Sequence, residues 1–530
     1  MLTWRRWLAG CVLPMLLVCL ASAERAPKPG PALESSLRLA PPQLTAQEAR
    51  RFIDRVAVRE NRFYQPGVGY DGRTGVTVDG VDIDFHTGRP VAVRNFSASS
   101  KESVHVALLV KALRGDRTAE LMLSPDPRYP GRASSRALEV LTTKIATYER
   151  FNREYPGFGG FLPWYTLRDG RLVPIPSVRE GDGWETRVPG LDNGQLAWSL
   201  YYAANALQEL GHRDLARRYR AYLGVLSRNV VDIFYDPASK QLRAESTMVR
   251  GNRRPPSKNA YATNARNPYY LDDSYEGLLL CHFADLFGDW SKHPAGRDAI
   301  WATPRRKPGS YTTASGQKIT IAKSWVGSSH EEWGELVLPF NALPLDRLLF
   351  SNAQRVRTAY SAEHGIPGLF ASTHKPIAPT ESPEYVGLAG FFAPRGTLER
   401  SRTRSIVAPY AAFPLALEPG GKPLFATWLK TMLDAPRMFG PLGMGESCSV
   451  TGEKIAPCLT WDGKALPMLA WMGGTRDELR RYLARDGKLA PFLARVEADY
   501  RLFDGLGIEG TKLPLRAPTA AVPWAISDFR

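Results

Sequence analysis

Two amphipathic stretches between residues 192 and 234 constrain the fold of this chain more than any other feature. In each stretch apolar side chains recur every three or four residues, which places them on one face of an α-helix. Gly211 ends the first stretch, and Asp214 is placed to cap the second. Because the connection is so short, we expect an antiparallel helical hairpin. The two stripes are Leu196, Leu200, Ala203 and Leu207, then Leu215, Tyr219, Tyr222, Leu226, Val230 and Ile233.

Similar helical patterns run along the rest of the chain, whereas strand signals are short and local, as at 167–175. The first helix starts at a capping box formed by Thr45 and Glu48. Strands and helices do not alternate, so a parallel sheet is excluded. The sequence therefore predicts an all-α fold, a toroid of helical hairpins with long functional loops. The further helices are expected at 101–114, 133–154, 273–287, 422–434 and 475–504, and the loops at 155–190, 300–332 and 361–410.

The N-terminal region has the layout of a secretory signal. Residues 1–23 begin with two arginines, continue with an apolar stretch and end in Ala21-Ser22-Ala23, a small-x-small cleavage site. A Pro-rich segment follows over 24–43, and no sharp linker divides 44–530, which we expect to be a single catalytic domain. The protein is therefore predicted to be exported, either periplasmic or secreted, with no stable membrane insertion after cleavage.

Three cysteines would remain after cleavage of the signal, and export determines whether they can form a disulfide. Cys448 and Cys458 lie in one Gly- and Pro-containing loop region, and an oxidising compartment favours a disulfide between them. Cys281 sits inside an apolar helical pattern and is expected to be a buried free thiol.

Charge and motif strings exclude several classes of function. The net charge of +16 is spread along the chain rather than gathered in blocks, which is typical of a solvated basic surface and not of a nucleic-acid site. The string Gly67 to Gly72 matches a dinucleotide fingerprint but follows Pro66 instead of a strand, so it is a turn. His330 opens a zinc-protease-like string that lacks its second histidine, and no Cys-x-x-Cys pair exists. We therefore predict no metal and no cofactor.

Five loop segments combine carboxylates with aromatic residues and glycines, the usual equipment of a carbohydrate site. Aromatic faces pack on the C–H faces of sugars, and carboxylates accept hydrogen bonds from hydroxyl groups. Glycoside hydrolysis then requires two carboxylates, one protonated and one ionised. The segments are YPGFGGFLPWY (155–165), GDGWETRVPGLDNGQ (181–195), YYLDDSYEG (269–277), SSHEEWGEL (328–336) and GMGESCSVTGEKIAPCLTWDGK (443–464).

Some of these acids have a purely structural alternative. Asp192 can be the N-cap of its helix rather than a sugar contact. Asp272 and Asp273 precede the expected helix at 273–287 and can cap it. Glu276 is harder to assign to a cap, because it falls between Tyr275 and a leucine run. Apolar surroundings raise the pKa of a carboxyl group, as a general acid requires.

Six short segments, in one order along residues 140 to 475, resemble those of exported endo-β-1,2-glucanases. The pattern is similar to glycoside hydrolase family 162, and more distantly to family 144 and related groups of the same clan. The segments are NPYYLDDSYEG, SSHEEWGELVLPF, GIPGLFAS, VAPYAAFPLAL, FGPLGMGES and LTWDGK.

This resemblance implies an (α/α)6 barrel that cleaves β-1,2-glucan internally to sophoro-oligosaccharides, with inversion and without a metal. Position by position, it implies that Glu276 is the general acid, with its proton passing through a sugar hydroxyl. It implies that Asp462 is the general base, acting through water. The substrate-binding residues expected beside them are Tyr275, Asp192, Glu332, Trp333, Tyr410, Glu446, Trp461 and Trp164.

Two alternative functions remain open at this stage. A polysaccharide lyase acting on an acidic polymer would suit the basic charge, although no cluster of His, Tyr and Arg in the sequence favours it. A non-catalytic glucan-binding protein of the cell envelope would have lost Glu276 or Asp462, and both are present. Fold alone does not decide among these.

Overall fold

The computed structural model shows a largely helical protein, with about half of the described residues in helices. The predicted signal, most of the Pro-rich segment and Tyr275 lie outside the described residues, and the single domain over 44–530 stays a prediction. The structure describes residues 43–176, 184–250, 261–263, 269–274, 276–323, 329–364, 368–369, 372–382, 384–386, 406–449, 452–518 and 527–530.

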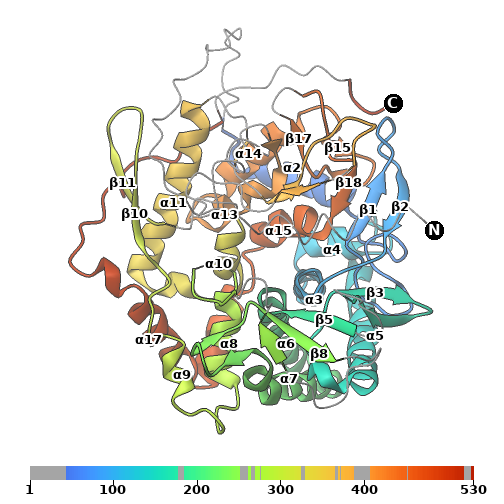
Figure 1. Ribbon diagram of the computed structural model, residues 1–530. Helices are drawn as coiled ribbons and strands as arrows, with labels where there is room; N and C mark the ends of the chain where they lie inside the picture. The colour runs from blue at the N-terminus through green and yellow to red at the C-terminus, as the bar shows by residue number, and fades with distance from the viewer. Residues whose placement is uncertain are drawn as a thin grey trace.

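Fifteen α-helices lie in these described ranges (Figure 1). They are α2 (Ala46–Glu60), α3 (Ser99–Leu113), α4 (Arg117–Leu123), α5 (Ala133–Glu154), α6 (Gly190–Glu209), α7 (Arg213–Phe234), α8 (Leu278–Phe287), α9 (Gly296–Ala299), α10 (Trp333–Val337), α11 (Pro344–Glu363), α13 (Phe413–Leu417), α14 (Lys422–Leu433), α15 (Trp461–Trp471), α16 (Arg476–Arg485) and α17 (Leu489–Asp499).

The helix boundaries confirm most of the sequence predictions and correct three. The capping box forms, with the Thr45 hydroxyl accepting from the Glu48 amide. The hairpin is α6 and α7, but their N-caps are Pro189 and His212 rather than Asp192 and Asp214. The pattern at 475–504 divides into α16 and α17 because Gly487 adopts a left-handed conformation between them. Helix α8 begins five residues later than expected, so Glu276 precedes it.

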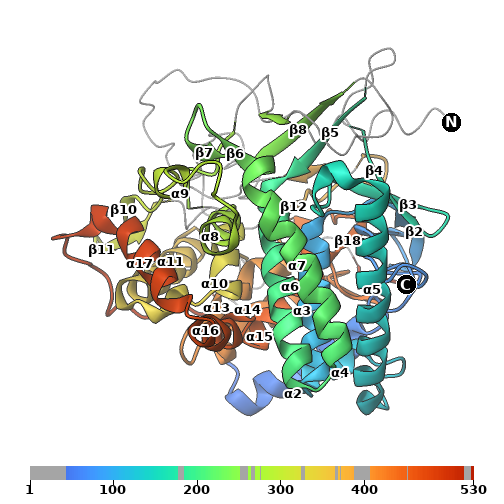
Figure 2. The ribbon, with the colours of Figure 1, turned by 90° about the horizontal axis from the view of Figure 1, so that it is seen from below.

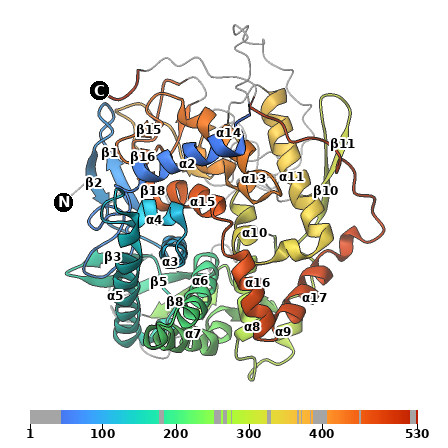
Figure 3. The same ribbon diagram turned by 180° about the vertical axis from the view of Figure 1, so that it is seen from behind.

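The helices form two layers. In Figure 1, α3, α6, α8, α10, α13 and α15 surround the middle of the molecule, while α2, α5, α7, α11, α14 and α17 lie around them. Helix α6 packs against α3, α7 and α8, and α15 packs against α3 and α13. Figure 2 shows α3, α5, α6 and α7 running side by side. Figure 3 shows α2 and α4 on the face that is turned away from the viewer in Figure 1. The inner helices are therefore sequence-distant segments brought together.

The strands are short, and within the described residues they pair with one another in antiparallel fashion. The largest sheets have three strands, in the orders β18-β1-β2 and β5-β8-β9, and the predicted turn at 167–175 is the hairpin β3–β4. The strands are β1 (Gly80–Ile83), β2 (Pro90–Arg94), β3 (Tyr165–Arg168), β4 (Arg171–Pro174), β5 (Trp184–Pro189), β6 (Tyr235–Asp236), β7 (Gln241–Leu242), β8 (Glu245–Arg250), β9 (Tyr261–Thr263), β10 (Pro308–Thr312), β11 (Lys318–Ala322), β12 (Thr373–His374), β13 (Tyr385–Val386), β14 (Ile406–Val407), β15 (Phe439–Gly440), β16 (Gly443–Met444), β17 (Cys448–Ser449) and β18 (Cys458–Thr460).

Two of these strands lead directly into inner helices. Strand β5 ends at Pro189, and α6 begins at the next residue; β18 ends at Thr460, and α15 begins at Trp461. Pairing of β18 with β1 and of β5 with β8 fixes the starting points of the two helices. The first turns of α6 and α15 are thus held by sheet pairing as well as by helix packing.

The predicted disulfide between Cys448 and Cys458 is not formed. Both side chains are buried free thiols, as is Cys281, which was expected to be one. Cys448 lies on β17, which pairs with β14, whereas Cys458 lies on β18, which pairs with β1. The two cysteines therefore belong to different sheets despite their proximity in the sequence.

One cluster of buried apolar side chains extends from Ala49 to Phe503 and fills the space between the two helical layers. Leu278 to Leu280 are part of it, as expected for packing residues. Of the helices within the described ranges, none combines the length and the apolar character needed to cross a membrane.

Gly194 tests how tightly the inner helices are packed. A Cβ atom added there would lie 2.5 Å from the backbone nitrogen of Leu280 in α8. We expect Gly194→Ala to push α6 and α8 apart and to lower the stability by about 1–3 kcal/mol. In Gly224→Ala, on α7, the nearest atom is the far end of Arg228 at 3.5 Å, so this control should be neutral or stabilising. Thermal unfolding compares them, and equal melting temperatures would refute the close packing.

Candidate active site

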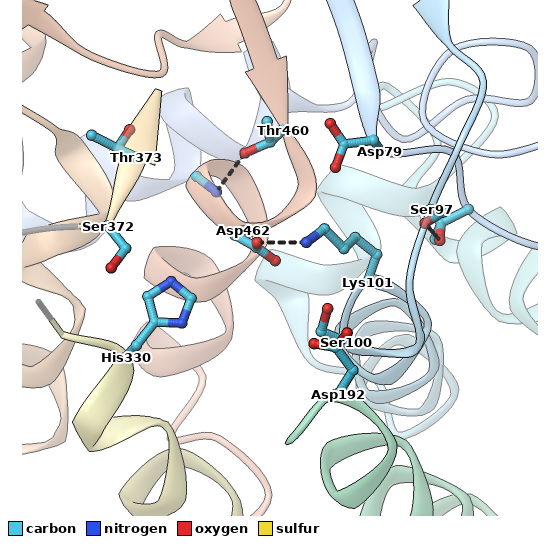
Figure 4. Close-up of polar contacts among 12 residues, drawn as sticks. Asp79, Ser97, Ser100, Lys101, Asp192, His330, Ser372, Thr373, Thr460 and Asp462 are labelled. Atoms are coloured by element: carbon cyan, nitrogen blue, oxygen red, sulfur yellow. Dashed lines mark hydrogen bonds and ion pairs between the residues drawn. The ribbon is translucent and has the colours of Figure 1, made fainter. Parts of the chain in front are cut away.

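Asp462 forms one side of a cluster of ionisable groups at the start of α15. Its Oδ2 atom lies 2.9 Å from the Nζ atom of Lys101, which extends from the first turn of α3. Its Oδ1 atom is buried and accepts no hydrogen bond from the described residues. Figure 4 shows Lys101 reaching across to Asp462, with Asp192 and His330 nearby. One carboxylate oxygen is therefore held by a cation, and the other is available to a further donor.

Glu446 fixes the helix that carries Asp462. The backbone amide and the hydroxyl group of Thr460, the N-cap of α15, both donate to Glu446 Oε2, and the Thr460 oxygen accepts from the Gly463 amide. His374 lies 3.2 Å from Glu446 Oε1. Burial would raise the pKa of Glu446, but these donors and the charge of His374 lower it to about 2. Glu446 is therefore an ionised support for α15, with both oxygens engaged inside the protein, and its role as a sugar contact stays a prediction.

Glu276 forms the other side of the cluster, on the segment just before α8. Its Oε2 atom accepts a hydrogen bond of 2.8 Å from Gln195 Nε2 and lies 3.1 Å from His330 Nδ1. Oε1 accepts no hydrogen bond from the residues that the structure describes. The side chain is buried, yet its carboxyl group meets polar partners instead of the apolar neighbours expected from the sequence. Both partners restrain one oxygen and leave the second for a ligand.

His330 is held in place by two of the predicted sugar-binding aromatics. The ring of His330 lies 5.5 Å from Trp333 and 5.9 Å from Tyr410, measured between centroids. Trp333 and Tyr410 are only 1% exposed, so neither offers a face to a sugar. Burial lowers the pKa of His330, but the hydrogen bond and charge of Glu276 outweigh it, and the net shift is upward. The two aromatics thus position a histidine whose protonated form is favoured.

Asp192 is the third carboxylate of the cluster. It lies in the first turn of α6, and its Oδ2 atom accepts a hydrogen bond of 3.3 Å from the indole of Trp164. Burial raises its pKa to about 6; Lys101 opposes the rise, and the charges of Glu276 and Asp462 add to it. Trp164 is partly exposed, unlike the other predicted tryptophans. Asp192 is therefore a carboxyl group with a raised pKa that lies beside Glu276 and Asp462.

Two further predicted contacts lie in the interior. Trp461 is 0% exposed and donates its indole N–H to the carbonyl of Gly69, 2.7 Å away. Glu332 is also fully buried and faces Arg357 and Gln354; burial raises its pKa to about 8. Both side chains are fully buried and held by partners inside the protein, and their role as sugar contacts stays a prediction.

The sequence analysis missed four side chains that the fold adds to the site. Lys101 and Gln195 contact Asp462 and Glu276, and His330 was discarded with its zinc-like string. Tyr385 on β13 is 37% exposed, and the burial of its hydroxyl and the nearby charge of Asp462 raise its pKa. Gln195 and His330 had a signal, because they lie in the segments GDGWETRVPGLDNGQ and SSHEEWGEL. Lys101 had none, since its partner is 361 residues away.

The arrangement suits acid–base chemistry on a neutral ligand. Asp462 and Glu276 are both buried and are held by separate donors, and Asp192 lies beside them. Within the described residues, no group of three or more His, Cys, Asp or Glu side chains is arranged to hold a metal ion. Two carboxylates with different partners are the minimal equipment for glycoside hydrolysis.

Comparison with known proteins places the chain in a class. The family model described as endo-beta-1,2-glucanase SGL, of glycoside hydrolase family 162, matches residues 76–530. The endo-beta-1,2-glucanase of Talaromyces funiculosus is 31% identical with a TM-score of 0.82, over 91% of this chain and 96% of that one. Its structures include a Glu→Gln mutant in complex with beta-1,2-glucan, and a complex with sophorose. No curated protein matches this sequence.

A more distant structure shares the fold alone. The endo-beta-1,2-glucanase of Chitinophaga pinensis, in complex with sophorotriose and glucose, is 15% identical with a TM-score of 0.53, over 86% of this chain and 97% of that one. The fold and the site thus define a glycoside hydrolase. The chain belongs to glycoside hydrolase family 162, the SGL family of endo-β-1,2-glucanases.

The raised pKa of Asp192 predicts a pH-dependent stability. Between pH 4 and pH 6 the unfolded state loses the proton that folded Asp192 retains, so folding becomes less favourable as the pH rises. Asp192→Asn removes this effect, and we expect a gain on the order of 2 kcal/mol at pH 7 that vanishes below pH 4.

Asp486→Asn is the matched control with the opposite sign. Burial would raise the pKa of Asp486, but hydrogen bonds from Arg485 and Tyr201 lower it, so this variant should lose stability at pH 7. Melting temperatures from pH 3.5 to pH 7.5 compare the two variants. The same pH dependence in both would contradict the assignment.

Proposed function

We propose that this protein is an endo-β-1,2-glucanase that hydrolyses β-1,2-glucan internally and releases sophoro-oligosaccharides. The observation that carries the proposal is the match to the Talaromyces funiculosus enzyme over nine-tenths of both chains, since that enzyme is seen in complex with β-1,2-glucan. The carboxylate cluster supports it, because glucan cleavage requires an acid and a base on either side of the glycosidic bond.

In this proposal Glu276 is the general acid. Gln195 and His330 hold its Oε2 atom, so the proton leaves from Oε1, which no described residue engages. The family resemblance implies that the proton reaches the leaving oxygen through a hydroxyl group of the glucan. The contact of 3.1 Å between His330 Nδ1 and Oε2 stabilises the Glu276 carboxylate once its proton has been transferred.

Asp462 is the general base. Lys101 holds Oδ2, and Oδ1 is a buried acceptor to which a water molecule can donate. The water attacks the anomeric carbon from the face opposite the leaving oxygen, which inverts the configuration of the sugar. Neither carboxylate forms a bond to the sugar in this scheme.

The helix packing supports the (α/α)6 barrel that the resemblance implies. Contacts link α3 to α6, α6 to α8, α10 to α13, α13 to α15 and α15 back to α3, which are five of the six neighbour pairs of an inner ring of six helices. In such a barrel the starts of the inner helices lie at one end. Trp164, Asp192 and Tyr385 are partly exposed there, and we propose them as sugar contacts together with Tyr275.

Carboxamide variants test the acid and the base. We expect Glu276→Gln and Asp462→Asn to lower kcat on linear β-1,2-glucan by about a hundredfold or more, the range of general acid–base catalysis. Asp214→Asn, an exposed carboxylate at the start of α7, should retain full activity. The assay is release of reducing ends, with the oligosaccharides resolved by chromatography.

Asp192→Asn decides between two assignments of the acid. The raised pKa of Asp192 makes it the rival of Glu276, so a silent Asp192→Asn enzyme beside an active Glu276→Gln enzyme would overturn the scheme. Unsaturated products from an acidic polymer would favour the lyase. Binding of β-1,2-glucan without any product would favour the non-catalytic alternative.

Export is a further part of the proposal. The N-terminal segment of residues 1–23 has the layout of a secretory signal, which would direct the enzyme to the periplasm or the medium. The mass of the protein recovered after secretion by a bacterial host tests this. A chain that begins at Glu24 supports export, and a chain that retains Met1 within the cytoplasm contradicts it.

A further inference from the structure

Lys101 joins two helices at the centre of the cluster. Its Nζ atom lies 2.9 Å from Asp462 Oδ2, and both side chains are mostly buried, with 16% and 11% of their surface exposed. Lys101 occupies the third position of α3, where the helix dipole disfavours a positive charge. Its neighbour Glu102 points to the opposite side and pairs with Lys144 in the core. The helix dipole alone would disfavour a lysine at this position, so a different interaction must account for its placement.

The charges around Lys101 explain why a lysine occupies this position. Asp79 is paired with Arg94 at 2.9 Å, and Glu276 has Gln195 and His330. For Asp462, Lys101 is the ion-pair partner that the described residues provide. The titratable groups that face Asp462 from the surrounding elements are Lys101 on α3, Asp192 on α6, His330 before α10, Tyr385 on β13 and Tyr410 before α13.

The second oxygen of Asp462 completes the argument. Oδ1 is buried and receives no hydrogen bond from the described residues, although buried carboxylate oxygens are nearly always satisfied. An ordered water is the donor that such an atom requires. Because the ammonium group engages only Oδ2, it fixes the plane of the carboxylate and leaves Oδ1 directed at that water.

We propose that Lys101 is the positioning residue of the catalytic base. It supplies the counter-charge of the Asp462 carboxylate and sets the orientation in which Oδ1 accepts the proton of the attacking water. This inference rests on the proposed glucanase activity, in which Asp462 is the base. Lys101 itself does not touch the substrate.

The pH dependence of the reaction distinguishes positioning from a purely structural role. In Lys101→Met, Asp462 loses its counter-charge beside Asp192, so the ascending limb of kcat/KM should move upward by one pH unit or more. We expect kcat at pH 5 to fall at least a hundredfold, with KM changed less than threefold. Lys101→Arg retains the charge and should keep the limb in place with a reduced kcat.

Lys111→Met is the matched control on the same helix. Lys111 forms an equally buried ion pair with Glu478, 2.6 Å away, but lies ten residues from Lys101 along α3. Its profile should keep the wild-type shape. An unshifted profile in Lys101→Met, or a raised KM with an unchanged kcat, would overturn the proposal. A wild-type enzyme inactive on β-1,2-glucan would refute the proposed function instead.

Stability provides a second readout that does not depend on activity. The melting temperature of Lys101→Met should fall more at pH 7.5 than at pH 4.5, because an unpaired buried carboxylate is costly only when ionised. Combining Asp462→Asn with Lys101→Met should restore most of the lost melting temperature at pH 7.5. Combining Asp192→Asn with Lys101→Met should restore less of it. Recovery through Asp192→Asn alone would show that Lys101 serves Asp192, and the proposal would fail.

Discussion

Six helices begin at one cluster of polar side chains, and the rest of the site depends on this convergence. Lys101, Asp192 and Asp462 lie in the first turns of α3, α6 and α15, Glu276 directly precedes α8, and His330 and Tyr410 lie in the short 3-10 turns that lead into α10 and α13. The start of a helix carries partial positive charge and unpaired amides, so it favours carboxylates. The fold thereby gathers acids that are far apart in the sequence.

Convergence alone would leave three mutually repelling carboxylates, and the protein compensates each one differently. Asp462 receives an ammonium group, and Glu276 receives an amide and an imidazole. Asp192 receives the indole N–H of Trp164, a hydrogen bond from Ser100 and the more distant charge of Lys101. Asp192 accordingly has the raised pKa. Different partners thus give three similar carboxyl groups different surroundings, and differences of this kind are what acid–base catalysis demands.

The sequence predicted the scaffold better than the site. Helical periodicity predicted both ends of α5 and of α7 to within one residue of their observed positions, because apolar stripes and glycine stops are local signals. The resemblance supplied Glu276 and Asp462 as candidates, but it could not show that Trp461 and Trp333 face inward, since aromatic residues in glycine-rich loops serve packing and sugar binding equally. Lys101 carried no signal at all. Its function follows from a partner 361 residues away, and only the folded chain brings the two together.

The central claim is that Glu276 and Asp462 act as separate acid and base on a water molecule. The anomeric configuration of the first product tests it most directly, by proton NMR recorded within seconds of adding enzyme to linear β-1,2-glucan. Inversion at the β-linkage predicts that the new reducing end appears first as the α-anomer and then mutarotates. First appearance of the β-anomer would mean retention through a covalent intermediate, and the roles assigned to both carboxylates would be wrong.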